Sequence, residues 1–358
     1  MKSYKNLWDK FISDDNIKKA VKNASKGKRK RPEVLEIYEN VDKYISCIRR
    51  YVCNYKSRLK KPRIIMEGPK ERKIIVPSFK EQIMHHMIVN VLKPIIMKGM
   101  YKHSHGSIPG RGPALAKKTI VKWIKDTKNV KYFLKMDIHK FFASIKHTEL
   151  KDFISTYIRD TRLLHVIYEV IDCCPKGLPL GFHTSHWLAN WFLQRLDYHI
   201  KQKLGAKYYM RYMDDMVIFC SNKKVLHNIR KEIDAYLRSI KLKLKENWQV
   251  CRFHNVRQGI DYFRFLDFMG FRFYRNRVTL RKGIMLRMVR RAKRYHLHKS
   301  IYSARQMLSA LGWIKQTDTY FMYLAYIKPY INFGVIKRKI SRYDRSIFNQ
   351  YVLESGVI

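Results

Sequence analysis

The chain has 358 residues, of which 46% are hydrophobic, so it can bury a sizeable core in two or three closely packed subdomains. Its 75 Lys and Arg residues against 28 Asp and Glu give a formal net charge of +47, an excess that indicates a polyanionic partner such as RNA or DNA. The chain has six cysteines but no Cys-x-x-Cys pair, which argues against a zinc site and a disulfide framework. Its N-terminus has no apolar stretch, which argues against a membrane segment, and we expect a cytoplasmic protein.

The N-terminal part of the chain predicts a helix, a hairpin and a second helix. Apolar residues spaced by three and four mark one amphipathic helix over residues 34–48. Two isoleucine-containing runs, residues 62–66 and 72–76, flank a Gly-Pro pair and predict a β-hairpin. Ser78, followed three residues later by Glu81, forms a capping box, so the next helix should begin there.

A glycine-rich stretch, residues 101–112, precedes a predicted basic helix. Because glycine lets the backbone approach a ligand closely, we expect this loop to contact a ligand such as a phosphate. Arg111 in the loop and Lys117 in the helix are cations that suit such a ligand. The glycines do not have the spacing of a phosphate-binding P-loop, so an ordinary surface loop is the alternative interpretation.

The central predicted element is a hairpin that carries two adjacent aspartates. Residues 207–211 and 216–220 have strand-like composition, and Asp214 and Asp215 between them favour a tight turn. Two like charges held this close lose ionisation on burial unless a cation compensates, so we infer a metal-binding turn. For an Asp-Asp pair alone, a solvated turn is the more ordinary interpretation.

Asp137 supplies a third carboxylate, because it directly follows a strand predicted over residues 131–136. Hard oxygen ligands that converge from two strand ends suit Mg²⁺. Two such ions, about 4 Å apart, can activate a 3′-hydroxyl and stabilise a leaving pyrophosphate. The three aspartates together therefore favour the metal site over the solvated turn.

Downstream of the aspartate hairpin the pattern predicts a helix, a strand, a second hairpin and further helices. The helix covers residues 222–240, and residues 241–248 alternate as in a strand. The second hairpin pairs residues 265–274 with residues 277–281. From Ile284 onward the chain reads as basic helices.

The sequence Tyr212-Met213-Asp214-Asp215, with Asp137 and the loop of residues 177–181, resembles the palm of a reverse transcriptase. The resemblance runs from about residue 6 to the last helices. It is nearest to the bacterial and phage enzymes of diversity-generating retroelements, and group II intron and antiphage-defence reverse transcriptases are similar.

This resemblance implies an α/β fold of the right-hand polymerase type, with fingers, a palm made of an antiparallel sheet plus helices, and a helical thumb. The expected domains are an N-terminal helical extension (residues 1–60), fingers (61–130), a palm (131–282, with finger-derived helices at about 147–175) and a helical thumb with a C-terminal tail (283–358).

The resemblance also assigns roles to individual residues. Asp137, Asp214 and Asp215 are the expected catalytic residues and, with the backbone carbonyl of Ile138, hold two Mg²⁺ ions, for which Mn²⁺ can substitute. Phe142, five residues after Asp137, excludes a 2′-hydroxyl, although packing in the core is the alternative. The other expected contacts are nucleotide binding by Lys70, Arg72, Phe142, Leu180 and Gly181, a primer grip at Phe268, Met269 and Gly270, and template or duplex binding by Arg111, Lys117, Arg287 and Arg291.

Two residues bear on fidelity, and two lysines are candidates for proton transfer. Leu180 stands where many reverse transcriptases have a glutamine that contacts the nucleotide, and an aliphatic residue there is typical of error-prone diversity-generating enzymes. His186 departs from that subgroup, which usually has glutamine. Losing a polar contact weakens discrimination between correct and incorrect pairs. Lys243 or Lys245 could protonate the departing pyrophosphate.

The expected function is RNA-directed DNA synthesis by an error-prone, bacterial or phage-encoded enzyme of a diversity-generating retroelement. The partners would be an RNA template, a DNA primer or cDNA product and dNTPs, with a small helical accessory protein or a structured non-coding RNA, and no membrane. One alternative is an antiphage-defence reverse transcriptase that copies a small non-coding RNA. Another is a non-catalytic RNA-binding scaffold.

Overall fold

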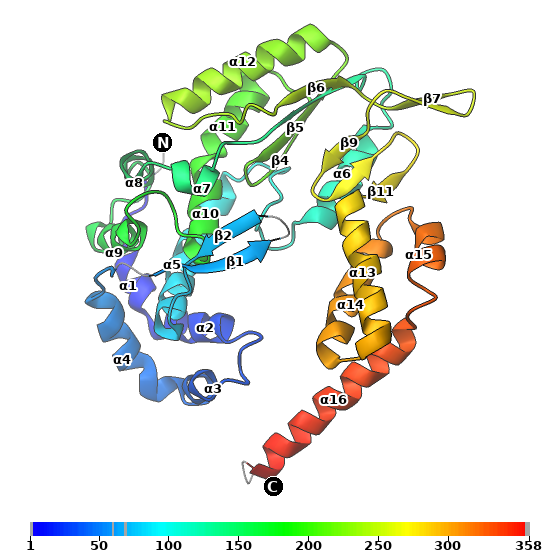
Figure 1. The fold of residues 1–358 in the computed structure, drawn as a ribbon. Coiled ribbons are helices and arrows are strands. Elements are labelled where there is room, and N and C mark those ends of the chain that lie inside the picture. Colours follow the sequence, from blue (N-terminus) through cyan, green and yellow to red (C-terminus); the bar gives the residue numbers. More distant parts are fainter. Residues whose placement is uncertain (1–2, 59–60, 68–69, 355–358) are drawn as a thin grey trace. The chain divides into compact units, whose positions relative to one another are not determined.

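Helices and short antiparallel strands alternate along the chain (Figure 1), which confirms the expected α/β class. The computed structural model describes residues 3–58, 61–67 and 70–354, without the side chains of Glu67, Lys70, Arg257 and residues 348–354. The chain divides into two compact units, which we call unit 1 (Met1–Gly112 with Leu134–Val250) and unit 2 (Pro113–Phe133 with Cys251–Ile358). None of the helices within the described ranges has the length and apolar character that crossing a membrane requires.

Unit 1 begins with a group of helices in which α2 packs against α5. The single helix expected over residues 34–48 is wrong, because the chain forms two helices that meet at Asn40. The backbone N–H of Asn40 makes the last helical bond, to the carbonyl of Glu36, and its side-chain amide donates to the same carbonyl, while its backbone leaves the helical region at φ −107° and ψ 35°. The helices are α1 (Trp8–Ile12), α2 (Asp14–Ala24), α3 (Pro32–Glu39), α4 (Val41–Cys53) and α5 (Phe79–Lys98).

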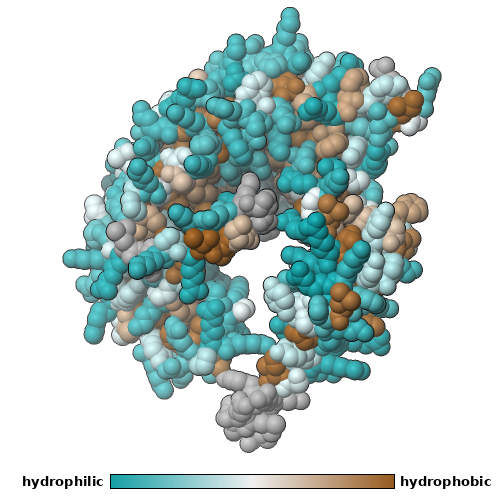
Figure 2. Space-filling view, in the orientation of Figure 1, coloured by the Kyte–Doolittle hydropathy of each residue, from teal (hydrophilic) through white to brown (hydrophobic). Residues whose placement is uncertain are grey.

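The predicted N-terminal hairpin is confirmed as β1 (Arg63–Glu67) paired antiparallel with β2 (Lys70–Ile74). It leaves Ile64, Ile65 and Met66 exposed, and Figure 2 shows a hydrophobic patch where Figure 1 draws these strands. The capping box is also confirmed, since Ser78 and Glu81 exchange hydrogen bonds at the start of α5.

The end of the β1–β2 hairpin lies directly on the loop before α10. The N–H of Ile75 donates to the carbonyl of Leu180 at 2.8 Å. Gly181 has φ +108°, and a Cβ atom built on it would lie 2.2 Å from the carbonyl oxygen of Ile75. Only glycine fits this close approach, so the Leu180–Gly181 loop and the hairpin are fixed to each other.

A four-stranded sheet with the order β4-β5-β3-β6 carries the central hairpin. β4 and β5 pair antiparallel with Tyr212 opposite Asp215, so Met213 and Asp214 alone form the turn. Both strands are mostly buried, as the strand-forming residues predict. The strands are β3 (Tyr132–Met136), β4 (Tyr208–Tyr212), β5 (Asp215–Cys220) and β6 (Gln249–Arg252).

The remaining helices of unit 1 surround this sheet, and α12 packs against β5. The helical segment that follows the loop of residues 177–181 is interrupted at Leu193 and ends in a π-helical turn. The helix expected over residues 222–240 is confirmed as α12, which Asn222 caps. The segments are α7 (Phe141–Ser144), α8 (His147–Ser155), α9 (Thr161–Asp172), α10 (His183–Phe192), α11 (Gln194–Tyr198), the π-helix His199–Lys203 and α12 (Lys223–Ser239).

The strand predicted over residues 241–248 is wrong. Lys241 has φ 59°, and the N–H of Leu242 donates to Leu237 at 2.8 Å, so the chain turns back under the end of α12. Leu244 alone makes an isolated bridge, to Ile138. The alternating pattern reflects the burial of Leu242 in a loop and not strand pairing.

Unit 2 combines a small meander with basic helices. The single hairpin expected over residues 265–281 is wrong, because Met269 (φ 53°) and Gly270 (φ 86°) form a turn that folds residues 265–274 back on themselves. A further hairpin, β7 (Asn255–Arg257) with β8 (Ile260–Tyr262), was not predicted. The other elements are α6 (Pro113–Trp123), β9 (Leu266–Phe268), β10 (Phe271–Phe273), β11 (Val278–Leu280), α13 (Lys282–His298), α14 (Ile301–Ile314), α15 (Tyr320–Tyr326) and α16 (Phe333–Glu354).

Candidate active site

Three aspartates lie at neighbouring ends of two strands in unit 1. Asp137 directly follows β3, Asp214 lies in the β4–β5 turn, and Asp215 is the first residue of β5. Because β3 and β5 are adjacent in the sheet, the fold brings these carboxylates to one edge. The three residues that the sequence singled out are therefore close in space.

The pKa of Asp214 reflects the nearness of the other two aspartates. Burial, and then the negative charges of Asp137 and Asp215, raise the pKa of the Asp214 carboxyl from 3.8 to about 7. A hydrogen bond to Asp137 also favours the protonated form of Asp214. The half-buried Asp214 carboxyl is therefore protonated in acid and only about half ionised near neutral pH in the metal-free protein.

Asp137 has one carboxylate oxygen in contact with a lysine and one without a partner. Oδ2 lies 3.3 Å from the Nζ of Lys245, and the backbone N–H of Lys245 donates to the carbonyl of Asp137 at 2.8 Å. Oδ1 is buried and accepts no hydrogen bond from the described part of the chain. Of the two lysines considered for proton transfer, Lys245 is thus the one in contact with an aspartate of the site.

The residue set fits a divalent cation in its chemistry. A buried oxygen without a hydrogen bond and a carboxyl with a raised pKa are both relieved by a cation, and carboxylates are the hard ligands that Mg²⁺ prefers. Ile138 has a buried side chain, so its backbone carbonyl is the ligand that it could add. Among the described residues, no three His, Cys, Asp or Glu side chains are already arranged as a metal-binding group.

A fully buried ion pair lies beneath the aspartate hairpin. The guanidinium of Arg211 donates from Nε and Nη2 to the two carboxylate oxygens of Asp197, at 2.8 and 2.6 Å, and both side chains are 0% exposed. Tyr209 donates to the same carboxylate at 2.7 Å. The Nη1 of Arg211 donates to the side chain of Asn190 at 2.9 Å and to the carbonyl of Met213 at 3.1 Å. Arg211 therefore connects helices α10 and α11 to the turn that carries Asp214.

The glycine-rich loop of residues 101–112 fixes the same turn from its other side. Asn190 donates to the carbonyl of Gly106 at 2.9 Å, and a Cβ atom on Gly106 would lie 2.6 Å from the backbone nitrogen of Met213. Met213 is held at φ 57°, a conformation that favours glycine. The close backbone approach expected of this loop is thus made to the hairpin itself. Arg111 donates to carbonyls of its own loop, Tyr101 at 2.6 Å and Ser104 at 2.9 Å.

Our sequence reasoning missed Asn190, Asp197 and Arg211. A signal was available, because Arg211 stands in a strand whose other residues are apolar or aromatic, and a charge at such a position requires a buried partner. Nothing in the sequence identifies that partner, which lies on a separate helix.

The residues expected to bind the nucleotide lie on separate elements of unit 1. Phe141 is buried in the core, whereas Phe142 is half-buried with its ring 5.4 Å from that of His186. Leu180 and Gly181 lie under the end of β2, as described above. Arg72 is exposed on β2, and the side chain of Lys70 lies outside the described residues.

The other expected contacts belong to unit 2. Phe268 is fully buried, and Met269 and Gly270 form the β9–β10 turn. Arg287 and Arg291 are exposed on α13. Lys117 donates its ammonium group to the carbonyl of Gln316, and burial lowers its pKa. Lys117 thus makes a hydrogen bond within unit 2.

Comparison with known proteins finds a matching family model and curated relatives that align with part of the chain. A family model described as reverse transcriptase (RNA-dependent DNA polymerase) matches residues 59–265. The retron Ec73 reverse transcriptase of Escherichia coli is 32% identical over 131 residues, which cover 32% of this chain and 40% of the relative. The group II intron-encoded protein LtrA of Lactococcus lactis is 27% identical over 143 residues, 37% of this chain and 23% of that protein. The matched segments thus span less than half the length of these curated relatives.

Among solved structures, apo telomerase from Candida tropicalis is similar to this chain. The TM-score is 0.50 at 13% sequence identity, over 71% of this chain and 53% of that chain. Identity this low bears on the fold alone, and the fold shared is the right-hand polymerase fold that we expected.

The buried pair should dominate the stability of unit 1. Replacing Arg211 by Met leaves the Asp197 carboxylate buried without its charge partner, so we expect the free energy of unfolding to fall by about 3–5 kcal/mol in urea titrations. The matched control is Arg238→Met, which removes an exposed pair with Asp234 and should cost about 0.5 kcal/mol or less. Equal losses in the two variants would contradict a special role for the buried pair.

The raised pKa of Asp214 predicts a pH dependence of stability in the metal-free protein. Because the folded-state pKa, about 7, lies above the ordinary value of 3.8, the stabilisation is complete below about pH 4 and is lost as the pH rises towards 7. Asp214→Asn removes this titration, so its stability relative to wild type should increase by about 2–4 kcal/mol between pH 4 and 8. Urea titrations in the presence of a chelator measure this, and parallel pH profiles for the two proteins would refute it.

Proposed function

We propose that this chain, which belongs to the reverse transcriptase family, extends a DNA primer on an RNA template by nucleotidyl transfer at Asp137, Asp214 and Asp215. The observation that carries the proposal is the electrostatic coupling of Asp214 to the other two aspartates at one edge of the sheet. A non-catalytic RNA-binding scaffold has no need of carboxylates held this close, because their mutual repulsion costs stability.

Each residue of the site has a role in this proposal. The three carboxylates and the carbonyl of Ile138 would hold two divalent cations, Mg²⁺ or Mn²⁺ in its place, which when bound supply Lewis-acid stabilisation of the reacting phosphate. Lys245, 3.3 Å from Asp137, is the residue placed to give a proton to the leaving pyrophosphate.

Substrate selection would come from the fingers and from the loop before α10. Phe142 presents a half-buried ring that His186 supports from one side, and this ring would exclude a 2′-hydroxyl. Lys70 and Arg72 on β2 would bind the triphosphate. Leu180 and Gly181 would support the incoming nucleotide, since their backbone is fixed against Ile75.

Contacts to the nucleic acid would come from the remaining cations and from the β9–β10 turn. Arg287 and Arg291 on α13 suit duplex phosphates, and Phe268, Met269 and Gly270 would grip the primer. Arg111 and Lys117 also donate to carbonyls of the protein, so template contact would have to use their remaining donors. The proposed domains are an extension (1–60), fingers (61–130), palm (131–282) and thumb (283–358).

For the biological role, we propose error-prone synthesis within a diversity-generating retroelement. Its support is Leu180, whose side chain offers the nucleotide no hydrogen bond. The second candidate is an antiphage-defence enzyme that copies a small non-coding RNA. It stays open because the curated relatives are named for a retron and a group II intron, and not for a diversity-generating element.

The test gives the purified protein a primed RNA template, Mg²⁺ and one dNTP at a time, and measures correct and mismatched extension. We expect Asp214→Asn to lower the extension rate on the order of 10³-fold or more, because the loss of a metal ligand costs several kcal/mol in the transition state. RNA binding by this variant should be unchanged. Asp234→Asn on α12 is the matched control and should retain wild-type activity.

Measurable synthesis by Asp214→Asn would overturn the proposed mechanism, and binding of RNA without extension by wild type would favour the scaffold. Frequent misincorporation opposite template adenine supports the mutagenic role, whereas accurate extension supports the defence candidate.

A further inference from the structure

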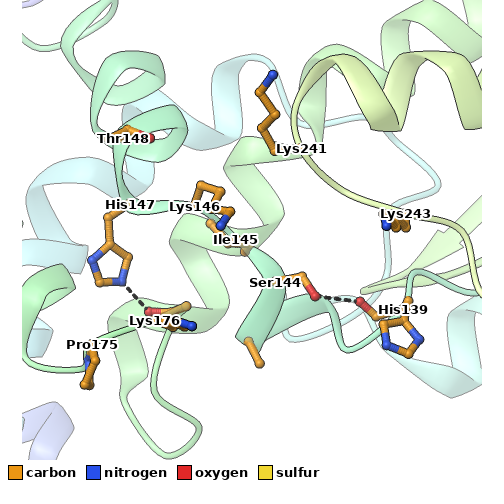
Figure 3. A pocket seen from close by; sticks show the side chains of 12 residues that line it. His139, Ser144, Ile145, Lys146, His147, Thr148, Pro175, Lys176, Lys241 and Lys243 are labelled. Carbon is orange, nitrogen blue, oxygen red and sulfur yellow. Dashed lines mark hydrogen bonds between the residues drawn. The ribbon is translucent and has the colours of Figure 1, made fainter.

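A pocket of about 470 Å³ opens in unit 1 beside the candidate active site (Figure 3). Its walls come from four segments, the residues after β3, the start of α8, the loop before α10 and the loop after α12. Figure 3 shows side chains from all four segments around the cavity. Four lysines line it, Lys146, Lys176, Lys241 and Lys243, together with the imidazoles of His139 and His147.

The positive charge of this pocket is not compensated by the protein. None of the lining residues is acidic. All four lysines are exposed, and in the described chain their ammonium groups make no ion pair or hydrogen bond. The nearby carboxylate of Asp172 is already shared by His147, at 3.1 Å, and by Lys151. Lysines gathered in this way repel one another unless an anion joins them.

The start of α8 adds backbone donors to the same pocket. Lys146 is the N-cap of this nine-residue helix, and no side chain caps its first N–H groups. Helix N-termini with free N–H groups favour the oxygens of a phosphate. The lysines and the helix start therefore favour the same class of ligand.

The pocket is joined by backbone hydrogen bonds to the segment that holds Asp137. The N–H of His139, two residues after Asp137, donates to the carbonyl of Lys243 at 2.9 Å. Two residues further, the N–H of Lys245 donates to the carbonyl of Asp137 at 2.8 Å. The pocket residues His139 and Lys243 thus lie on the same two segments as Asp137 and Lys245, and these backbone hydrogen bonds join the two segments.

We propose that this pocket binds inorganic pyrophosphate, the anion that nucleotidyl transfer releases beside Asp137. The choice of ligand rests on the proposed function. A phosphate group of RNA shares the same chemistry, but a cavity walled by four segments suits a small free anion better than a continuous strand.

The test is a calorimetric titration of the full chain with sodium pyrophosphate in buffer free of divalent cations. The variant Lys146→Gln/Lys176→Gln/Lys241→Gln removes three charges at exposed positions. Its dissociation constant for pyrophosphate should rise by about 10- to 100-fold, because three exposed charge contacts are lost. The matched control, Lys223→Gln/Lys224→Gln/Lys231→Gln on α12, removes the same charge outside the pocket and should bind as wild type does.

A wild-type protein that binds no pyrophosphate, or equal weakening in the two triple variants, would overturn the proposal. A pocket variant that loses affinity for a single-stranded RNA oligonucleotide while keeping its affinity for pyrophosphate would overturn it in favour of RNA. Asp214→Asn separates this proposal from the proposed function, because it should bind pyrophosphate normally. If wild type makes no DNA but binds pyrophosphate through these lysines, the pocket proposal stands and the proposed function fails.

Discussion

Arg211 and Asp197 form an ion pair that is entirely shielded from solvent, and the geometry of the candidate site depends on it. Burying two charges costs several kcal/mol per ion, which only close contacts and further hydrogen bonds can offset. Here the guanidinium makes two bonds to the carboxylate and reaches Asn190 and the carbonyl of Met213. The turn that carries Asp214 is thereby held from below, and Gly106 holds it from the side.

This rigid support explains how the protein keeps repelling carboxylates together. A flexible turn would let Asp214 move away from Asp137, but Met213 is fixed in a conformation that methionine rarely adopts. The remaining strain is electrostatic, and it shows as the raised pKa of Asp214 and the unpartnered oxygen of Asp137. A divalent cation would relieve both, so we expect cation binding to remove an electrostatic cost that the metal-free hairpin carries.

Features set by neighbouring residues could be predicted from the sequence, and features set by distant packing could not. The aspartate hairpin, the β1–β2 hairpin and the capping box at Ser78 depend on local turn and cap chemistry, and all three are present. Asn40 interrupts a helix, and Met269 interrupts a strand, that the sequence pattern predicted to be continuous. The partner of Arg211 and the contact of Lys245 with Asp137 depend on which segments the fold brings together, which no local pattern records.

The central claim is that Asp137 and the two aspartates of the β4–β5 hairpin bind divalent cations together. Titration of the apo protein with Mn²⁺, followed by electron paramagnetic resonance of the free ion, tests it most directly. The account predicts saturable binding by wild type that weakens on the order of tenfold or more in Asp137→Asn, because a carboxylate ligand is lost. Mn²⁺ binding of the same affinity and stoichiometry in wild type and Asp137→Asn would contradict it.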